Sequence, residues 1–175
     1  MDRAERELRN ELSNWVSSRL SCDKAFVFAT LTMKQGIKHP NGFWERLDEI
    51  KADQNAEWFC RALNKRVFGN RYRRGEEKLE IFDGGHAPDG DCQRFHRHMA
   101  IELPQRLTLF GFGSLISRLW RASKFGYRIM DVQLADNPSA VVQYGLKLGV
   151  DALNVSALAI CNDGNEKAEQ RQPTL

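Results

Sequence analysis

The sequence lacks the cysteine pattern of a disulfide scaffold or of a thiolate zinc site. Its four cysteines are widely spaced, and no two of them form a CxxC pair. Together with the absence of an apolar leader, this spacing predicts free thiols in a reducing cytoplasm. No apolar run approaches the roughly 20 residues that a membrane-spanning helix needs. We therefore expect a cytoplasmic protein with no membrane partner.

A large excess of charge of one sign is also missing, because the 175 residues carry a formal net charge of only +3. The distribution of charge is more informative than its sum. Basic residues gather in one stretch that contains no acid, namely Arg61, Lys65, Arg66, Arg71, Arg73 and Arg74. Such a stretch is typical of a surface that follows a phosphate backbone, and equally of a solvated helix face and loop.

What is present is an ordinary globular composition, 42% hydrophobic and 28% charged, over a length that suits one domain. Apolar periodicity predicts helices over residues 4–20, 43–68, 106–122 and about 138–148. Alternating or β-branched runs predict strands over residues 25–35, 78–83, about 94–103 and 127–135.

This order of elements predicts an α+β fold, with an antiparallel sheet, helices packed on one face and the other face open for a site. Residues 84–91 are dense in Gly, Pro and Asp, and we expect them to form the loop of a β-hairpin. Residues 1–161 would form the single domain. Residues 162–175 are poor in apolar side chains and are expected to be a disordered tail.

The stretch RFHRHMAIELP, residues 94–104, places two of the four histidines two positions apart. Side chains on a strand alternate between faces, so His96 and His98 would share one face and Met99 and Ile101 the other. Arg97 would fall on the core side and is expected to reach solvent near the end of the hairpin. Two imidazoles so placed can share a divalent ion, although surface histidines on strands are also common.

Mg²⁺ or Mn²⁺ would require a carboxylate in addition to two imidazoles. The candidates for a third ligand on the neighbouring strand and loop are Asp83, Glu80 and His86. Each of these has an ordinary structural role as well, as a solvent-facing charge for Glu80 or as a turn residue for the other two. Glu102 shares the histidine face but lies farther along the strand.

The stretch VVQYGLKLG places Tyr144 and Lys147 three residues apart on an expected helix, and therefore on one face of it. A tyrosine hydroxyl can act as a nucleophile when its ionisation is favoured, and a neighbouring lysine can stabilise the charge that develops. The same pair is also compatible with a half-buried packing tyrosine and a solvated lysine.

Three stretches in this order resemble the motifs of the HUH endonuclease family, in particular the rolling-circle replication initiators of plasmids and phages. VFATLTM resembles the first motif, RFHRHMAIELP resembles the second, and VQYGLKLG resembles the third, Tyr-x-x-Lys on a helix. The similarity spans residues 24–155, and FCRALNKRVFGNRYRR and IFDGGHAP resemble flanking stretches of bacterial members. The chain departs from the pattern at Arg97, where a hydrophobic residue is usual, and at Asp83, where Glu is more usual. Leu148 follows Lys147, which favours the single-tyrosine class.

The resemblance implies an RRM-like sheet with a metal site on its open face. His96, His98 and Asp83, with Glu80 or His86 as alternatives to the last, would hold Mg²⁺ or Mn²⁺. Tyr144 would attack a phosphate of single-stranded or hairpin origin DNA and leave a 5′-phosphotyrosine bond, with Lys147 assisting. The basic stretch of residues 61–74 would bind the DNA backbone. No GxxxxGK[ST] motif occurs, so a host helicase would be a further partner.

Other functions fit the same sequence. A single-tyrosine transposase or a mobilisation relaxase would use the same chemistry on different DNA. A non-catalytic RRM-like module would bind nucleic acid through exposed aromatic side chains on its central strands. A family member that binds DNA without cutting it is the third alternative, because the presence of a motif does not establish activity.

Overall fold

The structure is a computed structural model that describes residues 24–87 and 95–135, together with Arg3, Arg6, Glu7, Asn10, Glu11 and Asn14. The N-terminal positions are helical and exposed, as expected for the outer face of the helix at residues 4–20. The helix expected at 138–148, with Tyr144 and Lys147, lies outside the described residues. So do the second half of the loop expected at 84–91 and the whole of the tail at 162–175.

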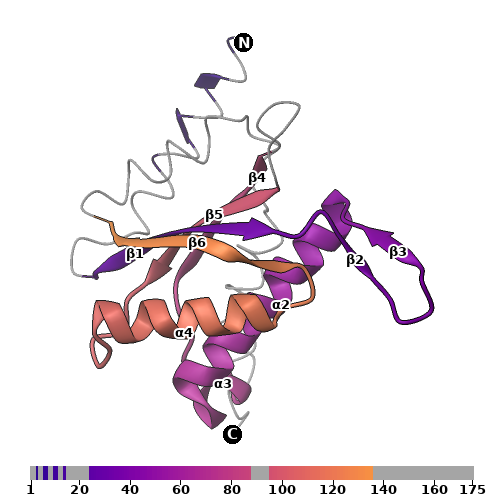
Figure 1. The fold of residues 1–175 in the computed structure, drawn as a ribbon. Coiled ribbons are helices and arrows are strands. Elements are labelled where there is room, and N and C mark those ends of the chain that lie inside the picture. Colours follow the sequence, from indigo (N-terminus) through magenta and orange to yellow (C-terminus); the bar gives the residue numbers. More distant parts are fainter. Residues whose placement is uncertain are drawn as a thin grey trace, which may run out of the picture.

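The centre of the fold is a four-stranded antiparallel sheet (Figure 1). Its strands are β1 (Phe26–Met33), β4 (Ile81–Ala87), β5 (His96–Glu102) and β6 (Gly126–Leu134). Their spatial order is β4-β5-β1-β6, so β1 and β5 are the two central strands. The expected α+β class and antiparallel sheet are confirmed.

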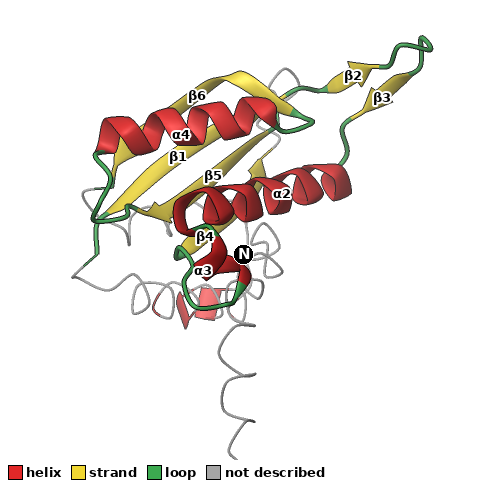
Figure 2. Ribbon diagram, turned by 90° about the horizontal axis from the view of Figure 1, so that it is seen from below, coloured by secondary structure: helices red, strands yellow, loops and turns green. Residues whose placement is uncertain are grey.

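Two long helices, α2 (Glu49–Phe68) and α4 (Leu109–Ala122), lie on the same face of this sheet (Figure 2). Each begins at a side-chain cap that accepts an otherwise unpaired backbone N–H. The Asp48 carboxylate accepts from the Lys51 amide at 2.9 Å, and the Thr108 hydroxyl accepts from the Gly111 amide at 3.1 Å. The short helix α3 (Asn70–Arg73) follows α2 after Gly69.

The hydrophobic core lies between the helices and one face of the sheet. Alternate residues of β1 point into it, namely Val27, Ala29, Leu31 and Met33. They meet aromatic and aliphatic side chains from α2 and α4, including Phe59, Leu63, Phe112, Ile116 and Trp120. Burying each of these large side chains stabilises the fold by about 1.5–3 kcal/mol. The face of the sheet that α2 and α4 cover therefore holds this core. On the opposite face, Phe26, Phe82 and Ala100 are also buried.

The structure differs from expectation in two places. Residues 43–48 were expected to begin a helix, but β2 (Gly36–Lys38) and β3 (Trp44–Arg46) form a separate hairpin before α2. Its turn contains Asn41-Gly42, a frequent turn pair, and Gly42 has a φ of 86°, which favours glycine. The second difference is that β4 continues through the glycines to Ala87, with a shift in register between Asp83 and His86. No helix within the described residues is long and apolar enough to cross a membrane.

Candidate metal and nucleic-acid site

The two histidines lie beside the threonines of the stretch VFATLTM. In the antiparallel pairing of β1 with β5, Thr30 is opposite His98 and Thr32 is opposite His96. Directly paired residues point to the same face of a sheet, with Cβ atoms about 4.5–5.5 Å apart. Residues that are distant in the sequence are thus brought together on the face that α2 and α4 leave uncovered. The expected division between a histidine face and a core face is confirmed, because Met99 and Ile101 lie in the core.

The imidazoles of His96 and His98 are neighbours, with ring centroids 4.7 Å apart and ring planes nearly perpendicular. The ring of Phe28, from β1, stacks on His98 at 5.5 Å with an angle of only 8° between the planes. His98 is buried and His96 is half-buried. The aromatic contacts on both sides restrict the orientation of the His98 ring, which is the kind of preorganisation that a metal ligand requires.

A hydrogen bond links His98 to the first-motif strand. The Thr30 hydroxyl and Nδ1 of His98 are 3.2 Å apart. When Nδ1 carries the ring proton, it donates to Thr30 Oγ1 and the lone pair lies on Nε2. This is the arrangement by which an oxygen acceptor usually orients a metal-binding histidine.

Thr32 occupies an irregular position in β1. The register between β1 and β6 shifts between Leu31 and Met33, and Thr32 lies inside that shift. Its hydroxyl donates to the Ile129 carbonyl, while its own carbonyl accepts from Trp120 Nε1 at 2.7 Å. Sheet irregularities of this kind often occur beside functional sites, where they re-aim side chains. Here the buried Trp120 of α4 holds the irregularity next to His96.

Arg97 does not reach solvent, contrary to expectation. Its side chain is fully buried on the helix side, where it donates to Asp83 at 2.5 Å and to Asp53 of α2 at 2.6 Å. Burial lowers the pKa of the Arg97 guanidinium, but the two carboxylates outweigh burial and leave the pKa above its ordinary value. The charged residue between the histidines is therefore paired inside the core, and it leaves the open face to the imidazoles.

The structure does not bring Asp83 to the histidines. Asp83 is opposite Met99 in the pairing of β4 with β5, so its carboxylate lies on the helix side with Arg97. The expectation that Asp83 completes a metal site on the open face is corrected by this placement. The physical reason is strand alternation, because Asp83 shares a face with odd-numbered residues of β5.

The alternative third ligands are also placed elsewhere. Glu80 and Glu102 both accept from Lys24, at 3.0 and 3.3 Å, at the opposite end of β5 from His96. His86 is opposite Arg97 in the backbone register, and its side chain lies outside the described part. Among the residues that the structure describes, no group of three or more His, Cys, Asp or Glu side chains could hold a metal ion. Within this part of the chain, the site consists of the two imidazoles.

Sequence reasoning missed one acid on the histidine face. Asp131 of β6 is opposite Thr30, which is opposite His98, so the three form a row across the sheet. Asp131 is exposed, and its carboxylate accepts from Gln133 at 2.6 Å. With strands about 4.8 Å apart, its Cα lies on the order of 10 Å from that of His98. The alternation within residues 127–135 could have predicted which face of the sheet Asp131 lies on. It could not have predicted that Asp131 is aligned with Thr30 and His98, because the sequence does not give the register between strands.

The basic stretch of residues 61–74 lies on α2, α3 and the turn after them, in the helix layer. All six of its cations are exposed. Three are paired with nearby acids, Arg61 with Glu57, Arg71 with Glu77 and Arg74 with Glu76. The others, Lys65, Arg66 and Arg73, form no ion pair with a described residue. The stretch is thus partly neutralised, and it lies on the other side of the sheet from the histidines.

Exposed aromatic side chains are found on the hairpin and helices rather than on the central strands. The large exposed ones in the described ranges are Phe43, Trp44, Trp58 and Phe110, and none of these lies on β1 or β5. A module that stacks bases on its central strands needs aromatics there. On the histidine face of the central strands, the described residues include the imidazoles, the threonines and one half-buried aromatic ring, that of Phe28, which is stacked on His98.

No family model, curated protein or solved structure matches the chain. The fold and the site define the class of protein at a coarse level: an α+β domain with an antiparallel sheet, and with paired histidines on the face opposite α2 and α4.

Proposed function

We propose that this protein is a metal-dependent nicking and joining enzyme of the HUH endonuclease type, which acts on single-stranded origin DNA to initiate rolling-circle replication. One observation carries the proposal. Thr30 and Thr32 are opposite His98 and His96 on the open face, so two stretches that resemble separate family motifs are neighbours in space. Nothing in the sequence spacing alone requires that alignment.

The order of elements gives further support. The main sheet and its helices follow the chain order β1, α2, β4, β5, α4, β6, with β1 and β5 in the middle of the sheet. This is the β-α-β-β-α-β order of ferredoxin-like and RRM-like folds. An RRM-like sheet is the fold that the resemblance implies, and the histidines would then lie on its central strand.

The residues fit a divalent ion in part. His96 and His98 would supply two nitrogen ligands, and further oxygen ligands would come from outside the described residues or from water and DNA phosphate. When bound, Mg²⁺ or Mn²⁺ would polarise the scissile phosphate. Thr30 would fix the His98 tautomer through their 3.2 Å contact. Asp83 would stay in its ion pair with Arg97.

The covalent step would be carried by Tyr144, assisted by Lys147. The tyrosine oxygen would form a bond to phosphorus while the bond from phosphorus to the 3′ oxygen breaks. This leaves a 5′-phosphotyrosine ester and a free 3′-hydroxyl, which primes synthesis. Lys147, three residues later in the sequence, would stabilise the ionised tyrosine oxygen. Attack by a later 3′-hydroxyl would reverse the step and rejoin DNA, so no nucleotide cofactor is consumed.

The test is formation of a covalent protein–DNA adduct. Full-length protein is incubated with labelled single-stranded DNA that contains hairpin origins and with Mn²⁺, and adducts are separated on a denaturing gel. We expect an adduct that EDTA and Tyr144→Phe both abolish. Tyr127→Phe is the matched control, because Tyr127 lies on β6, which pairs with the first-motif strand, and its loss should leave the adduct intact. Absence of an adduct over a broad pool of origin DNA, with folded protein, would contradict the proposal.

The choice of DNA separates the initiator from proteins with the same chemistry. An initiator should form adducts with origin hairpins in preference to transposon-end hairpins or to transfer origins. Adducts only with transposon ends, or only with transfer origins, would identify a single-tyrosine transposase or a mobilisation relaxase.

A further inference from the structure

The hairpin of β2 and β3 projects from the body of the fold beyond the start of α2 (Figures 1 and 2). Its two strands are paired so that Gly36 is opposite Arg46 and Lys38 is opposite Trp44. Directly paired residues share a face, so these four belong to one face of the hairpin. Ile37 and Glu45 form the other face. The two faces differ sharply in chemistry.

The Trp44 indole lies against the backbone of Gly36 on the first face. A Cβ at Gly36 would be 2.7 Å from Trp44 Nε1 and 2.7 Å from the Glu45 carbonyl oxygen, closer than side-chain carbons approach. Glycine at this position therefore allows the indole to rest directly on the strand. The side chain nevertheless remains 54% exposed. An indole supported from below and open above is a platform on which a second flat ring can stack.

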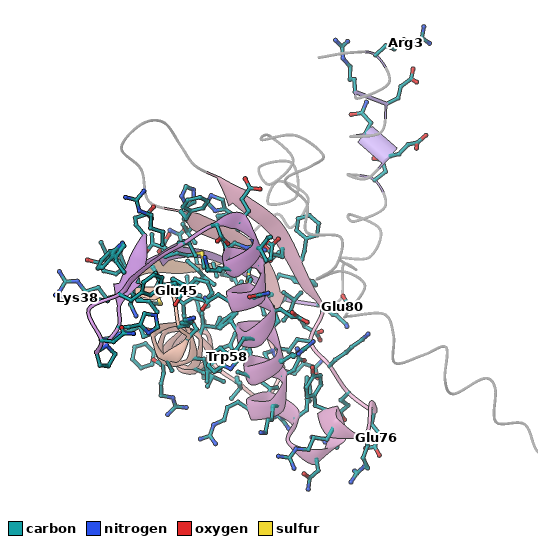
Figure 3. The ribbon with its side chains drawn as sticks, turned by 90° about the vertical axis from the view of Figure 1, so that its right-hand side faces the viewer. Arg3, Lys38, Glu45, Trp58, Glu76 and Glu80 are labelled. Carbon is teal, nitrogen blue, oxygen red and sulfur yellow. The ribbon has the colours of Figure 1, made fainter. Side chains whose placement is uncertain are left out.

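Two cations accompany this platform. Lys38 and Arg46 are exposed on the same face, and neither forms an ion pair with a described residue. The one acid in the two strands, Glu45, is on the other face, where it accepts from Lys124 at 2.8 Å and from His39 at 2.7 Å. Figure 3 shows Lys38 at the outer edge of the hairpin and Glu45 nearer the helices. The platform face is therefore positive, with its cations unpaired among the described residues.

The platform lies at the same end of the sheet as the histidine pair. β1 runs through Thr32, opposite His96, and Gly36 follows only four residues later. At 3.3–3.6 Å per residue, the chain between them spans at most about 14 Å. A flexible polymer held at the histidines could therefore reach the hairpin.

We propose that Trp44 is a base-stacking platform for single-stranded DNA, with Lys38 and Arg46 contacting the flanking phosphates. Proteins that bind single-stranded nucleic acid without sequence preference combine aromatic side chains, which stack on bases, with cations that contact the phosphate backbone. The choice of DNA as the polymer rests on the proposed function. The hairpin would then hold the strand on one side of the nick while the histidine site acts on it.

The test is equilibrium binding of a labelled 20-nucleotide oligothymidine to the full chain carrying Tyr144→Phe, in EDTA, so that no cleavage occurs. We expect Trp44→Leu to weaken binding by about tenfold or more, since each stacked base contributes about that much. Trp44→Phe should restore most of the loss, because a smaller ring still stacks. Trp58→Leu is the matched control, because Trp58 is a similarly exposed tryptophan on α2, and it should bind like the parent.

Quenching of tryptophan fluorescence on binding should disappear with Trp44→Leu and persist with Trp58→Leu. Equal affinity of Trp44→Leu and the parent, or equal losses for the two variants, would overturn the proposal. So would tighter binding of duplex DNA or of single-stranded RNA of the same length.

Failure here is distinguishable from failure of the nicking proposal. If the Trp44→Leu protein still forms the covalent adduct and binds DNA with unchanged affinity, only the proposal that Trp44 stacks on bases is overturned. Loss of binding in Trp44→Leu without any adduct in the tyrosine-intact parent would support the platform and overturn only the nicking chemistry.

Discussion

At the scale of single residues, Arg97 explains how a charge fits into the middle of a His-x-His motif. It points away from the histidines, and both of its acidic partners lie on the helix side. The sequence pattern predicted the face of Arg97 correctly from strand alternation. It did not predict burial, because the partner Asp53 comes from a helix 44 residues earlier, and only the packing of α2 on β5 brings the two together.

Substitution of Asp83 distinguishes its role as the buried partner of Arg97 from the role of metal ligand that the sequence predicted. Asp83→Asn should lower the free energy of unfolding by about 3–5 kcal/mol, because it leaves a fully buried guanidinium without its buried partner. It should leave Mn²⁺ affinity unchanged. Urea unfolding and calorimetric titration with Mn²⁺ measure the two quantities. Asp53→Asn is the control and should destabilise less, since the Asp53 side chain is 48% exposed. If Asp83→Asn leaves the free energy of unfolding unchanged but abolishes Mn²⁺ binding, Asp83 is a metal ligand after all.

The histidines give the complementary prediction. His96→Ala and His98→Ala should each weaken Mn²⁺ binding by at least tenfold, because each removes one of the two neighbouring imidazoles that we propose as nitrogen ligands. Titration of free Mn²⁺ by electron paramagnetic resonance measures the affinity. His39→Ala is the matched control, since this histidine lies on the projecting hairpin beside Glu45. Mn²⁺ binding that survives loss of both His96 and His98 would place the ion elsewhere.

At the scale of elements, the strands and helices of the main sheet were predictable because their patterns were strong. β1, β5, α4 and β6 agree with expectation to within a few residues. The β2–β3 hairpin was not predicted, because each strand has only three residues and too few positions to show alternation. The Asn41-Gly42 pair was the available signal, and the apolar residues after it resembled the start of a helix.

The hairpin is fastened to the body of the fold by a contact that depends on pH. Donation from Lys124, and then from His39, holds the pKa of the Glu45 carboxyl below its ordinary value of 4.5. Because the folded pKa is the lower one, this contact stabilises the hairpin fully above pH 4.5 and is lost as the pH falls through the folded pKa. The protection of the β2 and β3 amides from exchange, measured relative to the intrinsic rate at each pH, should therefore fall in acid below that point. Glu45→Gln should abolish this pH dependence, and an unchanged acid profile in that variant would contradict the assignment.

At the scale of the whole molecule, the main core and the candidate site lie on different sides of the sheet. The helices α2 and α4 cover one face (Figure 2), and the paired imidazoles and the threonines lie on the other face. The hairpin projects from the end of the sheet that carries the histidines. The basic stretch of residues 61–74 lies in the helix layer, where half of its charges are already paired. Its composition predicted a DNA surface, but the sequence could not show which layer would carry it.

The central claim is that Tyr144 becomes joined to DNA in a reaction that the histidine pair supports. Mass spectrometry of proteolytic peptides from the covalent adduct tests this most directly, because it identifies the residue that carries the nucleotide. The account predicts a 5′-phosphonucleotide on Tyr144, formed only with a divalent ion and lost with His96→Ala. A nucleotide on Tyr72 or Tyr127, or an adduct that forms equally well without either histidine, would contradict it.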